Sequence, residues 1–317
     1  MSTFKTEPTR KMFGEALVDY GAIDSRVVVL TADVSSSVLT TYFAERFPER
    51  FFNVGIAEAG MIDTAVGLAL GGTIPFASTF AALLLRAVEQ IRTCVAYAQT
   101  NVKLVGSYAG LSDFKDGPTH HSITDVAMMR SLPNMTVIVV ADSVEAKKMV
   151  PLVAQYPKPV YLRISRADMP AIFYDNHKVE IGKGVTVLDG QDVTIVANGH
   201  MLSRSIQAAE LLKIKGINAR VINIHTVKPL DTDLIKRCAE ETGAIVTAEE
   251  HSILGGLGSA VIEVLSRENP VPVEMIGIAD TFARTGPDHD SLLDYYGMSV
   301  NDITAAVQRI LKKKDRK

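Results

Sequence analysis

A carboxylate, Glu58, heads a stretch of small and apolar residues that runs to Leu70. The turn at residues 53–57 follows a strand-like segment, so Glu58 falls in the first turn of a predicted helix. A first-turn carboxylate stabilises a helix through the dipole and the free N–H groups, which is one explanation of this residue. The apolar helix predicts burial, however, and burial favours the neutral carboxyl group that can exchange a proton. Glu58 is therefore a candidate for proton transfer.

A second polar segment, Asp116-Gly117-Pro118-Thr119-His120-His121, follows the strand-like run at residues 102–105. Gly-Pro is a strong turn signal, so we expect these side chains on a loop. Loops at the carboxyl ends of parallel strands are where α/β sheets build their sites. Two adjacent histidines with an aspartate four residues earlier favour function over simple exposure, without naming a reaction. No third ligand at helical spacing supports a metal site, and we predict none.

The remaining motifs are less specific. Gly255-Gly256-Leu257-Gly258 lacks the final glycine of a dinucleotide-binding loop, so it predicts a tight strand-to-helix turn. Arg10 lies at the start of the first predicted helix, and Arg166 follows the predicted strand at residues 160–164. The arginine fork suits phosphate, yet arginine is as often a surface ion-pair residue, and both interpretations stay open for these two.

The elements that must position these residues alternate between short apolar strands and longer helices. Strands that are apolar throughout indicate a parallel sheet covered on both faces. Strands are predicted at residues 27–30, 102–105, 135–140 and 160–164, and helices at 10–20, 58–70, 83–99, 123–132 and 143–154. After an irregular stretch at 168–184, a second series places strands at 193–196, 219–224, 244–248 and 273–278, and helices at 202–214, 232–241, after 258 and at 301–313.

This layout predicts an α/β fold of two consecutive α/β domains with mainly parallel sheets. We place the boundary near residue 180, giving domains 1–180 and 181–317, each long enough to bury a core. The net charge of −3 gives no electrostatic case for nucleic acid or membrane, and two cysteines exclude a disulfide framework. Residues 64–85 carry no charge, but Gly71-Gly72 and Pro75 interrupt them, which predicts a helix, a turn, a short strand and the start of a helix. A polar N-terminus without an apolar core predicts a cytoplasmic protein.

Taken in order, these segments resemble the pyrimidine-binding and C-terminal domains of transketolase over nearly the whole chain. The resemblance rests on residues 55–61 around Glu58, Ser78-Thr79-Phe80, Asp116-Gly117-Pro118-Thr119-His120, Leu132-Pro133-Asn134-Met135 and residues 248–258. It implies thiamine diphosphate as the cofactor and transfer of a two-carbon ketol unit between sugar phosphates.

The resemblance also implies roles for single residues. Glu58 would hydrogen-bond N1′ of the aminopyrimidine, favouring the imino tautomer that removes the thiazolium C2 proton. Phe80 would stack on the pyrimidine, with Asp33 near both cofactor and substrate. The substrate residues would be His120, which handles hydroxyl protons, Asp116, which contacts a sugar hydroxyl, and Arg10, Ser37 and Arg166, which hold the phosphate.

One half of the expected enzyme is missing from the sequence. Transketolases bind diphosphate and Mg²⁺ through a Gly-Asp-Gly motif with a later asparagine, and no Gly-Asp-Gly occurs here. We therefore expect a separate N-terminal subunit that supplies Mg²⁺ and diphosphate binding, in an α2β2 assembly. The apolar helix at 58–70 and the residues around Leu83-Leu84-Leu85 are interface candidates, although core burial is the simpler explanation.

Several positions depart from the family pattern. Tyr108 stands where a substrate-site histidine is expected, Ser112-Asp113-Phe114-Lys115 replaces a glycine-rich acidic segment, and Leu83 and Arg86 stand where aromatic residues are expected. These changes leave the sugar open. The rival interpretations are the β chain of a 2-oxoacid dehydrogenase, a deoxyxylulose-phosphate-synthase-like enzyme and a non-catalytic partner subunit; the Asp-Gly-Pro-Thr-His segment speaks against the first.

Overall fold

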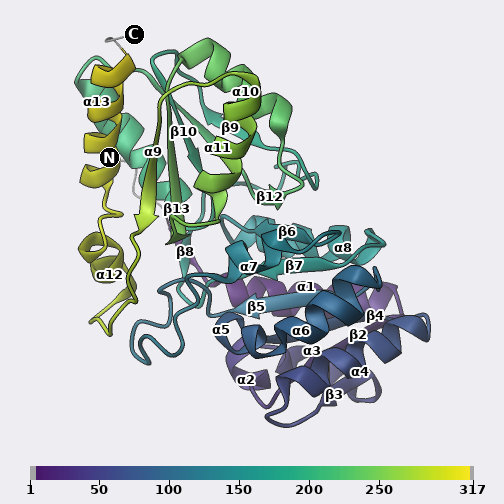
Figure 1. Ribbon diagram of the computed structural model, residues 1–317. Helices are drawn as coiled ribbons and strands as arrows, with labels where there is room; N and C mark the ends of the chain where they lie inside the picture. The colour runs from purple at the N-terminus through teal and green to yellow at the C-terminus, as the bar shows by residue number, and fades with distance from the viewer. Residues whose placement is uncertain (1–4, 315–317) are drawn as a thin grey trace.

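The computed structural model describes residues 5–314, which form two α/β domains, one above the other in Figure 1. The predicted fold class is confirmed: each domain holds one mainly parallel sheet between helices. The strands of the first domain are β2 (Val27–Thr31), β3 (Phe51–Asn53), β4 (Ile74–Phe80), β5 (Lys103–Ser107), β6 (Thr136–Val139) and β7 (Val160–Arg163). Its helices are α1 (Thr9–Ile23), α2 (Ser35–Val38), α3 (Thr41–Arg46), α4 (Glu58–Leu70), α5 (Ala81–Leu84), α6 (Val88–Gln90), α7 (Asp125–Ser131) and α8 (Ser143–Gln155).

The sheet of the first domain has the order β12-β6-β7-β5-β4-β2-β3. All neighbours are parallel except β12 (Thr226–Lys228), which runs antiparallel to β6. Successive side chains of a strand point to opposite faces, so the apolar strands need helices on both sides. In β2, Val27 and Val29 pack with α1 and α8, whereas Val28 and Leu30 pack with α4 and α7.

The second domain contains a five-stranded sheet in the order β14-β13-β10-β11-β9, with only β9 antiparallel to its neighbour. Its strands are β9 (Val185–Leu188), β10 (Val193–Ala197), β11 (Ala219–Asn223), β13 (Ile245–Ser252) and β14 (Val273–Ile278). Its helices are α9 (Met201–Ile214), α10 (Thr232–Thr242), α11 (Leu257–Glu268), α12 (His289–Tyr295) and α13 (Val300–Lys314). Helices α9 and α13 cover one face of this sheet, and α10 and α11 cover the other (Figure 1).

Two short pairings tie the halves of the chain together. Strand β12 comes from the second half of the sequence but completes the edge of the first sheet beside β6. Near the start of the chain, β1 (Thr6–Glu7) pairs with β8 (Met169–Pro170). The sequence pattern did not predict β12, because three residues carry too little periodicity to identify a strand.

Residues 64–85 form the end of α4, a turn, β4 and α5, as predicted from Gly71-Gly72 and Pro75. No helix in the described range 5–314 has the length and apolar character needed to cross a membrane. The single helix predicted at 83–99 is wrong: the chain there is divided among α5, short turns of 3-10 and α-helix and a π-helical stretch, Ile91–Tyr97. The prediction that α4 is deeply buried is also wrong in part. Only one face of the helix is buried, and Leu70 at its end is 76% exposed.

Candidate active site

The predicted site residues, apart from Arg10 in α1, follow the carboxyl ends of neighbouring parallel strands. In the sheet order β7-β5-β4-β2-β3, these strands lead to Arg166, the 108–124 loop, Phe80, the Asp33–Ser37 region and Glu58. The register pairs the last residues of the strands with one another, as Phe80 with Ser107 and Thr31 with Asn53. The segments therefore leave the sheet at one edge, where open α/β sheets bind ligands.

Glu58 is the first residue of α4 and is only 3% exposed. Its Oε2 lies 3.2 Å from Nη1 of Arg86, whose side chain is 63% exposed. The other oxygen, Oε1, is buried and has no hydrogen-bond partner within the described residues. Buried polar atoms are nearly always paired, so an unpaired oxygen at this edge is a candidate for binding a ligand group. The predicted burial of Glu58 is thus correct, and Arg86 is an additional partner.

Phe80 belongs to a compact aromatic cluster at the end of β4. Its ring stacks on Tyr108 with centroids 4.0 Å apart, and the ring of His120 lies 6.1 Å away. Arg10 donates from Nη1 to the hydroxyl of Tyr108 at 3.1 Å and also to the carbonyl of Ser37. Tyr108 thus joins the predicted cofactor residue Phe80 to the predicted substrate residues Arg10 and Ser37.

Arg166 reaches the same cluster from the other side. Its guanidinium lies 5.2 Å from the Tyr108 ring centroid and donates to Oδ1 of Asp113. Burial raises the pKa of Asp113, Arg166 opposes this effect, and the neighbouring Asp116 raises it further. The predicted phosphate ligands Arg10 and Arg166 therefore lie against the same aromatic ring.

The two adjacent histidines take different positions. His120 is partly exposed, and its Nδ1 lies 3.0 Å from the Thr119 hydroxyl, so its other nitrogen is available at the site. His121 is buried, with Nε2 3.0 Å from the backbone carbonyl of Asp113. Burial lowers the pKa of His121, which favours the neutral ring. His121 is therefore a structural residue of the loop, whereas His120 faces the aromatic cluster.

Asp33 lies beside the turn that leads to Glu58. It adopts a positive φ of 60°, and its backbone N–H donates to Oδ1 of Asn53 at 3.0 Å. The same Asn53 oxygen accepts from the backbone of Gly55 at 3.1 Å. Asn53 thus links the loops after β2 and β3, a role that the sequence did not reveal because the two loops are not adjacent in the chain.

Glu250 of β13 fixes the loop that carries the substrate candidates. Its Oε1 accepts from the backbone N–H of Leu111 at 2.6 Å and lies 2.8 Å from Nε2 of His289. A Cβ on Gly110 would lie 2.2 Å from this oxygen, so only glycine fits there. Burial would raise the pKa of Glu250, but His289 and Arg163 outweigh it and lower the pKa to about 2.

The predicted glycine turn also has a structural explanation. Both oxygens of Glu249 accept N–H groups at the start of α11, from Leu257 at 2.7 Å and from Gly258 at 2.9 Å. A Cβ on Gly256 would meet the Glu249 carboxylate at 2.1 Å. Residues 255–258 therefore form the strand-to-helix turn expected from the sequence.

Most of the predicted site residues form one connected cluster, made of Arg10, Ser37, Phe80, Tyr108, His120, Asp113 and Arg166, with Asp116 beside Asp113. Glu58 and Asp33 lie at the same sheet edge, but their own contacts are to Arg86 and Asn53. The unpaired Glu58 oxygen and the aromatic Phe80 are the groups that an aminopyrimidine requires, so the residues fit that half of thiamine diphosphate. Residues 5–314 hold no group of three or more potential metal ligands.

Comparisons with known proteins identify the family of both domains. Residues 5–171 match the family described as transketolase, pyrimidine binding domain, and residues 182–303 match transketolase, C-terminal domain. A putative transketolase C-terminal section from Methanocaldococcus jannaschii is 42% identical, over 96% of each chain. One of the subunits of apulose-4-phosphate transketolase from Phocaeicola vulgatus is 39% identical, over 96% of this chain and 97% of its own length.

A solved structure gives the same result at the level of the fold. A split gene transketolase, described as an inactive β4 tetramer, superimposes with a TM-score of 0.89 at 44% identity, covering 98% of this chain and 100% of the other. The predicted resemblance is confirmed, and the 2-oxoacid dehydrogenase alternative is not favoured. The chain therefore belongs to the transketolase family, as a C-terminal subunit of the split type.

Proposed function

We propose that this chain transfers a two-carbon ketol unit between sugar phosphates, with thiamine diphosphate, when it is paired with an N-terminal subunit. The observation that carries the proposal is Glu58: a buried carboxylate with one oxygen held by Arg86 and the other unpaired at the sheet edge. Thiamine diphosphate, when bound, supplies the carbon that accepts the two-carbon unit. Glu58 Oε1 would hold a proton at N1′ of the aminopyrimidine, and Phe80 would position the ring.

The remaining residues of the site suit a phosphorylated sugar. Arg10 and Arg166 place two positive charges against the Tyr108 ring, at 4.9 Å and 5.2 Å from its centroid. His120 would exchange protons with substrate hydroxyl groups, and Asp116 would accept a hydroxyl hydrogen bond. Ser37 fixes Arg10 through its backbone carbonyl, and Asp33 would contribute a carboxylate between cofactor and substrate.

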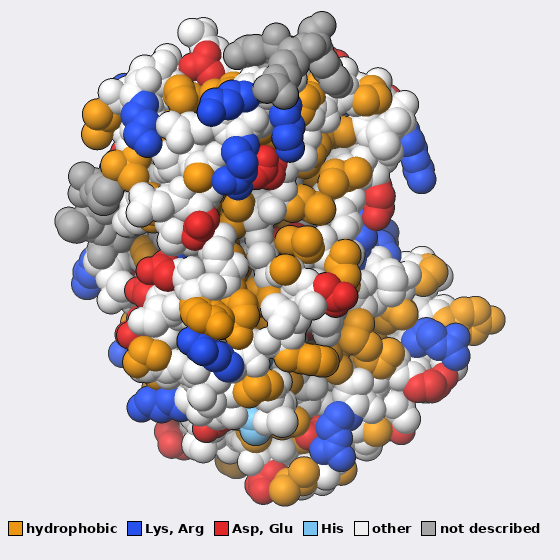
Figure 2. Space-filling model, turned by 60° about the vertical axis from the view of Figure 1, so that its left-hand side comes forward, with side chains coloured by type: hydrophobic (Ala, Val, Ile, Leu, Met, Phe, Trp, Pro, Cys, Tyr) orange, Lys and Arg blue, Asp and Glu red, His pale blue; other side chains and the backbone are white. Residues whose placement is uncertain are grey.

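The surface beside Glu58 supports a partner chain. Ile56, in the turn before α4, and Leu70, at its last residue, are 75% and 76% exposed. Hydrophobic side chains also gather in patches across the middle of the face shown in Figure 2. Exposed apolar area of this kind marks interaction surfaces. The partner would carry the diphosphate and Mg²⁺ motif that this sequence lacks, in an α2β2 assembly in the cytoplasm. The related split-gene chain described as an inactive β4 tetramer supports that requirement.

Co-expression tests this proposal. The chain would be produced with a partner of similar size that carries Gly-Asp-Gly and a later asparagine, and ketol transfer from ketose phosphates would be assayed with thiamine diphosphate and Mg²⁺. We expect turnover from the complex and none from either chain alone. Turnover by the single chain would reject the half-enzyme proposal. Decarboxylation of a 2-oxoacid by a complex that transfers no ketol unit would favour the dehydrogenase alternative instead.

A further inference from the structure

Tyr108, directly after β5, connects the cofactor side of the candidate active site to its phosphate side. Its ring stacks on Phe80 with centroids 4.0 Å apart, and its hydroxyl accepts from Nη1 of Arg10 at 3.1 Å. Both rings are buried, and Tyr108 is only 7% exposed. One side chain therefore contacts the ring assigned to the aminopyrimidine and a cation assigned to the sugar phosphate. A tyrosine stands here although the family pattern leads us to expect a histidine.

The backbone of Tyr108 adopts an uncommon conformation. Its φ is 58°, in the left-handed region that bulky side chains rarely occupy. The next residue, Ala109, donates its N–H to the carbonyl of Ile164, just beyond β7, at 3.2 Å. Backbone of this kind persists where the surrounding structure fixes it, and it is common at functional sites. The conformation therefore favours a role for the Tyr108 side chain within the site.

Arg10 keeps one edge of its guanidinium group free. Nη1 carries two hydrogens, and it donates to the hydroxyl of Tyr108 and to the carbonyl of Ser37. Nε and Nη2 have no acceptor among the described residues, and together they form the parallel fork that fits two phosphate oxygens. Neither partner of Nη1 is charged, so the positive charge of Arg10 is not neutralised. The hydroxyl thus holds one nitrogen and leaves the fork for an anion.

Arg166 lies against the same ring but has a different partner. Its guanidinium is 5.2 Å from the Tyr108 ring centroid, compared with 4.9 Å for Arg10. Its Nη1 donates to the buried carboxylate of Asp113, which offsets its charge. Of the two arginines, Arg10 therefore retains more of its charge for a ligand.

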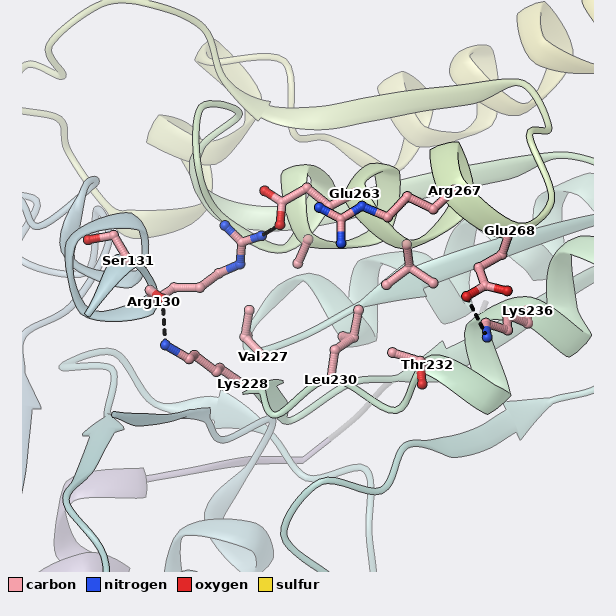
Figure 3. A pocket seen from close by; sticks show the side chains of 12 residues that line it. Arg130, Ser131, Val227, Lys228, Leu230, Thr232, Lys236, Glu263, Arg267 and Glu268 are labelled. Carbon is pink, nitrogen blue, oxygen red and sulfur yellow. Dashed lines mark hydrogen bonds and ion pairs between the residues drawn. The ribbon is translucent and has the colours of Figure 1, made fainter. Parts of the chain in front are cut away.

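Cations in a cleft between the domains are instead bonded to the protein. This cleft, of about 660 Å³, lies where α7 faces α10 and α11 (Figure 3). There Arg130 of α7 pairs with Glu263 of α11. Lys236 of α10 lies 3.1 Å from Glu268, and Nζ of Lys228 donates to the carbonyl of Arg130 at 2.9 Å. These contacts join neighbouring elements, whereas the Tyr108 hydroxyl orients a cation whose fork has no protein acceptor among the described residues.

We propose that Tyr108 is a positioning residue for the phosphorylated donor. Its hydroxyl turns Arg10 so that Nε and Nη2 face the sugar phosphate, and its ring holds Phe80 in place for the cofactor. This inference rests on the proposed function and names the residue that couples phosphate recognition to cofactor stacking. Phenylalanine at this position would keep the ring and lose only the hydroxyl, so the two roles can be measured separately.

Calorimetric titration of the complex with fructose 6-phosphate, without thiamine diphosphate, tests the hydroxyl. We expect Tyr108→Phe to weaken binding by about threefold to tenfold, because the hydrogen bond that orients Arg10 is lost. Affinity for unphosphorylated fructose should not change. In an Arg10→Ala background, Tyr108→Phe should have no further effect, because the hydroxyl acts through Arg10. An equal effect in both backgrounds, no effect in the parent, or no binding of fructose 6-phosphate to the parent complex would overturn the proposal.

Tyr161→Phe is the matched control. Tyr161 is also buried and would also lose a hydroxyl hydrogen bond, to Asp125 at 2.6 Å, but it belongs to β7 and packs in the core of the first domain. It should lower stability in urea and leave the affinity for fructose 6-phosphate unchanged. Weakening by this control as large as that by Tyr108→Phe would reduce the Tyr108 effect to a general loss of packing and overturn the proposal.

The ring is tested by the affinity of the complex for thiamine diphosphate. Tyr108→Leu should weaken cofactor binding because Phe80 loses its stacking partner, whereas Tyr108→Phe should not. Parental cofactor affinity in Tyr108→Leu would overturn the role of the ring.

These binding measurements need no turnover, so they separate this inference from the proposed function. If the parent complex binds fructose 6-phosphate through Arg10 and Tyr108 but transfers no ketol unit, the proposed function fails and the positioning role stands. If ketol transfer is normal and Tyr108→Phe has the parental KM for the phosphorylated donor, the positioning role fails and the proposed function stands.

Discussion

Two buried glutamates, Glu58 and Glu250, sit in contrasting surroundings. Both are at most 3% exposed. Glu250 accepts a backbone N–H of the first domain and contacts His289, and against the effect of burial His289 and Arg163 lower its pKa to about 2. Glu58 has one ion pair with an exposed arginine and one oxygen without a partner. Equal burial therefore accompanies a complete network in one case and an incomplete one in the other.

Two arginine–aspartate pairs at the end of β7 differ in exposure rather than in pairing. Arg163 lies 2.7 Å from Asp125, both are almost fully buried, and Tyr161 donates to the same carboxylate oxygen at 2.6 Å. Arg166, three residues later, pairs with Asp113, and its side chain is 28% exposed. Asp113 Oδ2 and Asp125 Oδ1 both accept no hydrogen bond from the described residues, so an unpaired oxygen occurs between the domains as well as at the candidate site. The cationic partners of Glu58 and Asp113 are at least partly exposed, whereas Arg163 is buried, and this exposure distinguishes the carboxylates of the candidate site.

The largest expected effect is on catalysis by the Glu58→Gln variant. In the complex with a partner, we expect the turnover number to fall by about 10³-fold, within the range for loss of proton transfer. The free energy of unfolding should change by less than about 1 kcal/mol, because Glu58 loses only one pair with an exposed arginine. Steady-state kinetics and urea unfolding measure the two. Turnover within tenfold of the parent would remove Glu58 from the assigned role.

For Glu250→Gln, by contrast, the main expected effect is a loss of stability. Its pKa of about 2, compared with a reference value of 4.5, corresponds to about 3 kcal/mol of stabilisation by the charged form. The variant should lose roughly that free energy of unfolding in urea at pH 7. Glu241→Gln is the control, because that exposed residue pairs only at the surface. If Glu250→Gln were as stable as the control, the network would not hold the loop.

Acid titration separates charge from shape at Glu250. The pKa is lower in the folded than in the unfolded chain, so its stabilisation is complete above about pH 4.5 and is lost as the pH falls toward 2. The difference in unfolding free energy between the parent and Glu250→Gln should therefore shrink across that window. Urea unfolding at pH 6, 4 and 3 measures it. A difference that stays constant would mean that the amide fails for reasons of packing.

Features of the candidate site that depend on neighbouring residues in the chain were predicted well from the sequence. The start of α4 at Glu58 and its end at Leu70 agree with the structure, because a turn, an apolar stretch and Gly71-Gly72 are all local signals. The loop position of Asp116 and His120 was predicted from Gly117-Pro118 for the same reason.

What the sequence could not predict depends on contacts between distant segments. The Glu250 bond to Leu111 joins residues 139 positions apart, and no pattern in either segment records it. The stacking of Phe80 on Tyr108 follows from the pairing of β4 with β5. The division of the helix at 83–99 has no glycine or proline to mark it. The apolar composition of α4 could not distinguish its core face from its exposed face.

A smaller effect is expected for Arg166→Ala, assayed with substrates. If Arg166 binds phosphate, KM for ketose phosphates should rise about tenfold or more, because a charged hydrogen bond is worth about 1.5–3 kcal/mol. KM for the unphosphorylated ketose should hardly change. Arg166→Lys keeps the charge but loses the fork, so its effect should be intermediate. Equal increases for both substrates would assign Arg166 to holding Asp113 alone.

The smallest effect, and the sharpest test of the contrast, is expected for Arg86→Gln. The Arg86 side chain is 63% exposed, so its pair with Glu58 should contribute less than about 1 kcal/mol to stability. Arg86 nevertheless fixes Oε2 and so directs Oε1 toward the site. We therefore expect unchanged urea unfolding and a several-fold fall in kcat of the complex, because Glu58 loses its only cationic partner among the described residues. Arg92→Gln, which breaks another exposed pair with Glu89, should leave both unchanged. If Arg86→Gln left kcat unchanged, as expected for Arg92→Gln, Arg86 would have no part in directing Glu58 Oε1 toward the site.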